Sequence, residues 1–113
     1  MPYLSLRTSA PLDAAKTQAL HRELAALIAV IPGKNENNCM IDIEGGCALF
    51  MRSEAILGAV VDLRMFGVSP MDAKQSFMEG LCEILREQLG VEKQNVYCNM
   101  AELEHWGSGG NFR

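Results

Sequence analysis

A chain of 113 residues has the length of one domain, and we expect residues 1–113 to form a single domain that gains buried surface from self-association. Hydrophobic residues make up 49% of the chain and charged residues 21%, which is typical of a globular protein rather than a disordered or membrane one. A net charge of −4 without any run of Lys or Arg argues against nucleic acid or an anionic membrane as a partner.

The first half of the chain alternates strand and helix signals. Residues 3–8 alternate between apolar and polar, which predicts a half-buried strand. Pro11-Leu12-Asp13 predicts a helix start with proline in the first turn, and Pro32-Gly33 predicts its end. Residues 39–44 predict a second strand, and Gly45-Gly46 predicts a turn into residues 47–51 as the return arm of a hairpin. The apolar stripe of the helix consists of Leu20, Leu24, Leu27, Ile28 and Ile31.

The second half repeats this order. Residues 56–66 predict a strand, and Ser69-Pro70 predicts a helix start with Ser69 as N-cap and Pro70 at the first helical position. Gly90 predicts the end of that helix, and residues 95–100 predict another strand. The tail, residues 105–112, is turn-rich, with Trp106 and Phe112 as predicted aromatic anchors. The apolar stripe of this helix consists of Phe77, Leu81, Ile84, Leu85 and Leu89.

The two halves match at an offset of about 58 residues, where Lys16 meets Lys74 and Leu27 meets Leu85. This pattern predicts an α+β fold, an α/β sandwich of two β-α-β repeats. The repeats would form one four-stranded mixed sheet with both helices on one face. The other face would carry Tyr3, Ser5, Arg7, Asp62, Arg64, Phe66, Tyr97 and Asn99. Its mixture of charges and aromatics suits a cyclic homo-oligomer, and a solvated sheet face is the alternative.

Cysteine usage and the start of the chain bear on the compartment. Cys39, Cys47, Cys82 and Cys98 show no C-x-x-C spacing and no paired histidines, so we expect buried reduced thiols, no metal site and no cofactor. The sequence shows no secretory signal and no apolar stretch near the roughly 20 residues that span a bilayer. These observations predict a cytoplasmic protein.

Pro2 follows the initiator methionine, and removal of Met1 would leave a secondary amine at the start of a strand. Such an amine, when buried or placed beside a cation, can lose its proton near neutral pH and act as a base. Proline at this position is also common without any catalytic role. A proline base needs a cation for an acidic substrate, polar donors for an oxyanion, and apolar walls.

Four other residues supply these groups, each with an ordinary structural alternative. Lys34 follows a helix-ending glycine, where a cation also complements the helix C-terminus. Tyr97 and Asn99 lie two apart in a strand and therefore share one face, where they would otherwise be an exposed aromatic and an edge amide. Phe66 ends a strand, where it would more often belong to the core.

Five short motifs carry a resemblance to a known family: Met1-Pro2, Gly33-Lys34, Phe66-Gly67, Val96-Tyr97-Cys98-Asn99, and the tail from Trp106 to Phe112. Together they resemble the macrophage migration inhibitory factor family, in its microbial type, within the tautomerase superfamily. The resemblance covers the whole chain. It implies the doubled β-α-β fold, a homotrimer with active sites between subunits, and keto–enol tautomerisation of phenylpyruvate-like α-keto acids by a phenylpyruvate tautomerase-type isomerase.

The resemblance also implies the roles of individual residues. Pro2 would be the catalytic base, Lys34 would bind the substrate carboxylate, and the backbone around Phe66 would line the pocket. Tyr97 and Asn99 would come from the neighbouring subunit. Trp106 would supply the C-terminal pocket aromatic, unless Ser108 occupies that position and leaves the site more open.

The chain departs from the animal members of the family at two places. Their C-x-x-C is replaced by Gly58-Ala59-Val60-Val61, which removes the residues of a thiol-redox role, and Asn38 stands where they have a tyrosine. Two alternative functions remain open. One is a cytokine-like binding protein, exported without a signal peptide, with a host receptor as partner. The other is a dehalogenase or decarboxylase reaction, for which Arg7 and Arg64 would be the extra arginines.

Overall fold

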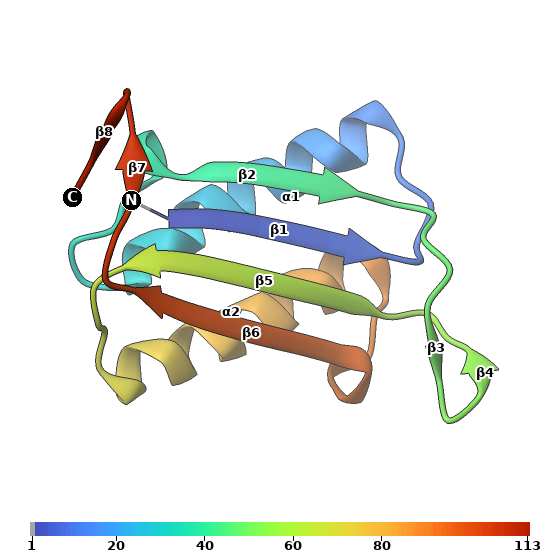
Figure 1. The fold of residues 1–113 in the computed structure, drawn as a ribbon. Helices are drawn as coiled ribbons and strands as arrows, with labels where there is room; N and C mark the ends of the chain where they lie inside the picture. Colours follow the sequence, from blue (N-terminus) through green and yellow to red (C-terminus); the bar gives the residue numbers. More distant parts are fainter. Residues whose placement is uncertain (1) are drawn as a thin grey trace.

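The structure is a computed structural model that describes residues 2–113. One four-stranded sheet has the strand order β2-β1-β5-β6, and both helices cover the same face of it (Figure 1). The elements, in chain order, are β1 (Pro2–Thr8), α1 (Ala14–Leu27), β2 (Met40–Glu44), β3 (Phe50–Met51), β4 (Glu54–Ala55), β5 (Ala59–Phe66), α2 (Met71–Leu89), β6 (Val96–Leu103), β7 (Gly107–Ser108) and β8 (Asn111–Phe112).

Strand pairing divides the sheet into two equivalent halves. β1 runs parallel to β2, and β5 runs parallel to β6, so each half is a β-α-β unit. The two halves meet where β1 and β5 pair antiparallel, with Pro2 opposite Met65 and Thr8 opposite Ala59. The predicted fold is confirmed. Because of this register, the start of β1 lies at the same end of the sheet as the end of β5.

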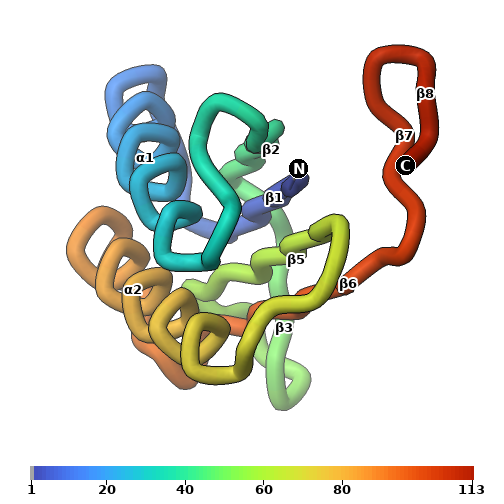
Figure 2. The backbone as a smooth tube through the Cα atoms, turned by 90° about the vertical axis from the view of Figure 1, so that its left-hand side faces the viewer, coloured from blue at the N-terminus to red at the C-terminus, as the bar shows by residue number. Residues whose placement is uncertain are grey.

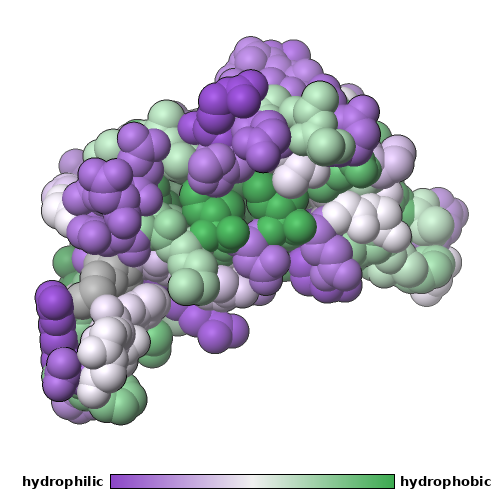
Figure 3. Space-filling view, turned by 90° about the horizontal axis from the view of Figure 1, so that it is seen from above, coloured by the Kyte–Doolittle hydropathy of each residue, from purple (hydrophilic) through white to green (hydrophobic). Residues whose placement is uncertain are grey.

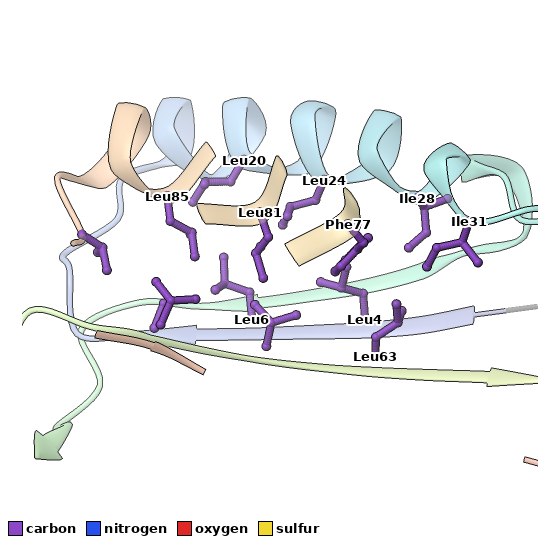
Figure 4. Packing of buried hydrophobic residues seen from close by; sticks show 14 of the residues in the cluster. Leu4, Leu6, Leu20, Leu24, Ile28, Ile31, Leu63, Phe77, Leu81 and Leu85 are labelled. Carbon is purple, nitrogen blue, oxygen red and sulfur yellow. The ribbon is translucent and has the colours of Figure 1, made fainter. Parts of the chain in front are cut away.

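The core lies between the sheet and the two helices. Alternate residues of β1 and β5 point toward the helices because strand side chains alternate between faces. Full burial of one leucine contributes about 1.5–3 kcal/mol, so a one-residue slip of either strand would be strongly unfavourable. Figure 4 labels the buried side chains that meet here: Leu4, Leu6, Leu20, Leu24, Ile28, Ile31, Leu63, Phe77, Leu81 and Leu85.

The helix starts differ from those that the sequence predicts. The N-cap of α1 is Asp13, whose side chain accepts a hydrogen bond from the Lys16 backbone N–H at 2.7 Å, so Pro11 precedes the helix. The N-cap of α2 is Pro70. The predicted N-cap Ser69 is wrong, because this residue is buried and its backbone N–H donates to the Glu102 carboxylate at 2.6 Å. Gly90, with φ of 71°, ends α2 as predicted.

The predicted hairpin between residues 39–44 and 47–51 is also wrong. The backbone N–H groups of Gly46 and Cys47 donate to the carbonyls of Ala10 and Thr8, at 2.9 and 3.0 Å. These bonds draw the chain away from β2 and past the end of β1. The hairpin forms later instead, where β3 pairs with β4 across the turn of Arg52 and Ser53.

β2 is an edge strand, and part of its helix-side surface remains open. Seen from above, the molecule shows strongly hydrophobic surface at its centre, between hydrophilic groups (Figure 3). Ile41 and Ile43 of β2 are half-buried and line a shallow cavity with Thr17, Gln18 and His21 of α1. This exposed edge agrees with the expectation that the domain gains buried surface from self-association.

Glu102 is expected to stabilise the end of β6 in a pH-dependent way. Its carboxylate binds the Lys74 ammonium and the Ser69 N–H, and these bonds hold the pKa of Glu102 below its ordinary value of 4.5. A lowered pKa stabilises the fold above the ordinary value, and that contribution is lost as the pH falls through the lowered value. Glu102→Gln should therefore reduce the free energy of unfolding at pH 7, and the difference from wild type should shrink below pH 4.5.

Urea unfolding of wild type, Glu102→Gln and Glu104→Gln at pH 7 and at pH 3 measures this effect. Glu104 is the matched control because it lies two residues further on, is exposed, and has no hydrogen bond or ion pair among the described residues. Equal destabilisation by Glu102→Gln at both pH values would contradict the prediction.

Candidate active site

Pro2 is buried at the start of β1 and lines a cavity of about 580 Å³. The cavity lies between this end of the sheet and the chain that follows β6. Its apolar wall consists of Met40 from β2, Leu103 from β6, and Trp106. Asn38 lines it too. A buried proline beside an apolar wall is the arrangement that a proline base requires.

The C-terminal segment closes one side of this cavity. After β6 the chain passes the start of β1, and the β7–β8 hairpin stands away from the helix-and-sheet layers (Figure 2). Two backbone hydrogen bonds between Trp106 and Arg113, at 3.2 and 2.9 Å, close the base of the hairpin. Trp106 is half-buried and Ser108 lines the same cavity. Phe112 is 82% exposed, so the prediction of a second aromatic anchor is wrong within one subunit.

Lys34 and Phe66 lie at the same end of the sheet but outside the lining of the cavity. The Lys34 ammonium donates to the Phe66 carbonyl at 2.9 Å. Gly33 precedes it with φ of 76°, a left-handed conformation that glycine adopts readily, and thereby turns the chain after α1. The structure thus places the ammonium of Lys34, the predicted cation, in a hydrogen bond with the backbone of Phe66, the predicted backbone position.

Tyr97 and Asn99 lie on the sheet face away from the helices, and Tyr97 is 60% exposed. In the register of the sheet, Tyr97 is opposite Val60, whereas Pro2 is opposite Met65. Five residues of strand separate these positions, about 17 Å at the usual rise per residue. Asn99 is opposite Asp62, three residues or about 10 Å from Met65, so one subunit brings neither Tyr97 nor Asn99 to its own Pro2.

Arg64 lines the Pro2 cavity, a position that the sequence analysis did not assign to it. Its guanidinium lies 5.7 Å from the centroid of the Tyr3 ring, directly across the β1–β5 pair. The antiparallel register of β1 and β5 would have predicted this position, because it places Arg64 next to Met65, the residue opposite Pro2. Arg7, the other arginine of this face, lies at the far end of β1 and pairs with Glu44.

A larger cavity of about 760 Å³ lies along the outer side of α2. Its lining includes Glu79, Glu83, Arg86 and Glu92, and Glu83 pairs with Arg86. Charges that already neutralise each other on an exposed helix surface are typical of a solvated face. The Pro2 cavity is therefore the candidate site.

The four cysteines are unpaired and half-buried rather than fully buried. Burial raises the pKa of Cys39 and of Cys98 to about 11, so both thiols stay protonated at neutral pH. Within residues 2–113, no three His, Cys, Asp or Glu side chains gather as a metal site would require. The described helices include none that is long and apolar enough to cross a membrane.

The sequence profile described as macrophage migration inhibitory factor (MIF) matches residues 1–111. The chain belongs to this family. It is 25% identical over 104 residues to a macrophage migration inhibitory factor homolog of Brugia malayi, covering 92% of this chain and 90% of the relative. That relative and the profile span nearly the whole chain, so membership does not rest on one motif.

Solved structures of MIF proteins share the fold. Leishmania major MIF2 superposes with a TM-score of 0.91 at 18% identity, over 100% of this chain and 97% of that one. A fused 4-OT protein, solved as an asymmetric trimer, gives a TM-score of 0.85 at 13% identity, over 96% and 94% of the two chains. At these identities the likeness concerns the fold, and the chemistry of this MIF-family chain must be argued from its own residues.

The raised pKa values of the Cys39 and Cys98 thiols predict slow alkylation of both. Cys39 adjoins Asn38 and Met40, and Cys98 lies between Tyr97 and Asn99. Because only the thiolate reacts, a pKa near 11 should slow iodoacetamide labelling at pH 8 by about 100-fold or more relative to the chain in urea. Timed labelling followed by peptide mass spectrometry measures the rates. Similar rates with and without urea would contradict the prediction.

Proposed function

We propose that this MIF-family chain is a keto–enol tautomerase that acts on phenylpyruvate-like α-keto acids. Its base is the Pro2 amine, released by removal of Met1, which lies outside the described residues. The observation that carries the proposal is the burial of Pro2 in a cavity that the Arg64 guanidinium and an apolar wall also line. Membership of the MIF family supports a tautomerase-like or MIF-type function in coarser terms.

The proposed reaction moves one proton between carbon and oxygen. The Pro2 nitrogen removes a proton from the carbon next to the ketone, and the C–H electrons form the carbon–carbon double bond. The ketone oxygen becomes an enolate oxygen and is then protonated within the site, so that no atom is gained or lost. General acid–base catalysis of this kind contributes typically about 10²–10⁴-fold to a rate.

The other residues bind and orient the substrate in this proposal. Lys34, held at the Phe66 carbonyl, binds the carboxylate next to the ketone, and the backbone around Phe66 extends the site beyond the cavity lining of one subunit. Trp106 packs against the substrate side chain, because it is a half-buried aromatic residue of the cavity wall. An apolar wall also keeps water from the amine and favours its neutral form.

Tyr97 and Asn99 enter the site from a neighbouring subunit of a homotrimer. The support is their position on the open face of the sheet, about 17 Å along the strands from Pro2 for Tyr97 and about 10 Å for Asn99. A cyclic assembly can bring this end of one subunit against the Pro2 end of the next. The trimer of the fused 4-OT neighbour shows that this fold can assemble in that number.

Pro2→Gly should lower the kcat for ketonisation of enol-phenylpyruvate by about 100-fold or more, because the base loses its position and its secondary amine. Stopped-flow absorbance measures the rate, and mass spectrometry first establishes that Met1 is absent. Pro11→Gly is the matched control, since Pro11 is exposed and lies outside the cavity lining. Equal rates for wild type and Pro2→Gly would refute the proposed base.

Subunit complementation tests the shared site. Neither Pro2→Gly nor the double variant Tyr97→Ala/Asn99→Ala should be active alone. After random assembly of equal amounts, about one site in three of each mixed trimer, or about a quarter of all sites, should combine an intact Pro2 with an intact neighbouring Tyr97 and Asn99. The activity of the mixture should therefore exceed that of either parent many-fold. No gain of activity in a verified mixed trimer would contradict the site between subunits.

A further inference from the structure

We propose that Arg64 binds a second acidic group of the substrate, so that the Pro2 cavity accepts α-keto acids that carry two carboxylates in addition to phenylpyruvate-like acids. This inference rests on the proposed function and deepens it, because it names a substrate class for the same site. It also gives Arg64 a role different from that of Lys34, the cation that the family resemblance assigns to the site.

The first support is the position of Arg64. Met65 is directly opposite Pro2 in the register of β1 and β5, and Arg64 is the residue before it, opposite Tyr3. Its side chain lies on the open face of the sheet and lines the cavity with Pro2 and Trp106. A ligand in this cavity would therefore lie within reach of both the proline and the guanidinium.

The second support is that the guanidinium is held in place from behind. The Arg64 guanidinium lies over the Tyr3 ring, 5.7 Å from its centroid, a cation–π contact of about 0.5–1 kcal/mol at an exposed site. Tyr3 is fixed in turn because its hydroxyl donates to the Asp42 carboxylate at 3.0 Å. Stacking uses the flat face of the guanidinium and leaves its N–H groups available for a carboxylate, which binds two of them side by side.

The third support is that the Arg64 guanidinium forms no ion pair with an acidic side chain among the described residues. Arg7 pairs with Glu44, and Arg86 pairs with Glu83. Among residues 2–113, Arg64 has no hydrogen bond or ion pair, and neither Asp nor Glu lines the cavity. Although the chain as a whole carries 14 acidic residues against 10 Lys and Arg, the lining of this cavity contains Arg64 and no acid. Such a cavity favours anionic ligands.

The fourth support is the presence of two separate cations at this end of β5. The Lys34 ammonium lies at the Phe66 carbonyl, and Phe66 is two residues beyond Arg64 on the same strand. Two residues of strand span about 7 Å, a spacing at which two cations can bind the opposite ends of one small diacid. The carboxylate beside the ketone would bind Lys34, the distal one Arg64, and the reacting carbon would lie between them near Pro2.

The test compares two enol substrates, enol-oxaloacetate with two carboxylates and enol-phenylpyruvate with one, in wild type and Arg64→Gln. For enol-oxaloacetate, Arg64→Gln should lower kcat/KM by about 10-fold or more, chiefly through KM, as expected for a lost charge-assisted hydrogen bond. For enol-phenylpyruvate the change should stay within about 3-fold. Arg64→Lys should fall between, because an ammonium binds a carboxylate without the two-pronged fork.

Arg7→Gln is the matched control, since Arg7 lies on the same sheet face but pairs with Glu44 at the other end of β1. It should leave the ratio of the two substrates unchanged. Thermal unfolding of each variant checks that the fold is retained. The inference is overturned if Arg64→Gln lowers kcat/KM equally for both substrates, or if Arg7→Gln shifts the ratio as much as Arg64→Gln does.

Binding of inert acids gives a readout that needs no turnover. Wild type should bind succinate more tightly than butyrate in calorimetry, and Arg64→Gln should abolish most of that difference; an unchanged difference would overturn the inference. Pro2→Gly keeps the two proposals apart. If Pro2→Gly turns over both enols as fast as wild type, the proposed tautomerase base fails, while the succinate result still decides the role of Arg64.

Discussion

The antiparallel pairing of β1 with β5 is the constraint on which the rest of the molecule depends. It joins the two β-α-β halves, and its register determines which residues share each end of the sheet. Because Pro2 is opposite Met65, the first strand begins where the third long strand ends. The chain after β6 leaves the sheet at this same end and covers it. A change of this register would move the lining residues of the cavity apart without changing the identity of any of them.

The two faces of the sheet carry different kinds of side chain. The helix face is filled by leucines, isoleucines and Phe77, which hold the strands in one register. The open face carries the polar and aromatic side chains, joined across strands by the contacts Tyr3–Asp42, Arg7–Glu44 and Asn99–Asp62. The apolar core thus lies on one side of the sheet and the polar contacts on the other. This separation explains how a small domain can place charged groups beside a buried proline.

The parts of the fold that the sequence predicts are those with a strong local pattern. The alternation of residues 3–8 and the helical stripe around Leu81 hold because burial and local geometry favour the same structure. Two predictions failed where a tertiary contact prevailed. Ser69 has the side chain of a helix N-cap, but its backbone bonds to Glu102. Gly45 suggested a turn, but a side chain there would collide with Leu12, so its role is to allow close packing.

The candidate site shows the same division. Pro2 and Trp106 were predicted from short motifs, and the structure places both in one cavity. Lys34 and Phe66 meet through one hydrogen bond, a contact between residues 32 positions apart that no local pattern contains. Arg64 was recognised only as a residue of the open face. Its place beside Pro2 follows from strand register, which depends on the fit of two faces rather than on either segment alone.

The hairpin closure at Trp106 has a practical consequence for handling the protein. Arg113 is hydrogen-bonded to the residue that walls the cavity, and Pro2 lies inside that cavity. Both ends of the described chain therefore lie at the same end of the sheet, beside the candidate site (Figure 1). An affinity tag on the amino end would turn the proline nitrogen into an amide. A fusion to the carboxyl end would attach a bulky group to the β7–β8 hairpin beside the candidate site. Material without either extension is the appropriate sample for kinetics.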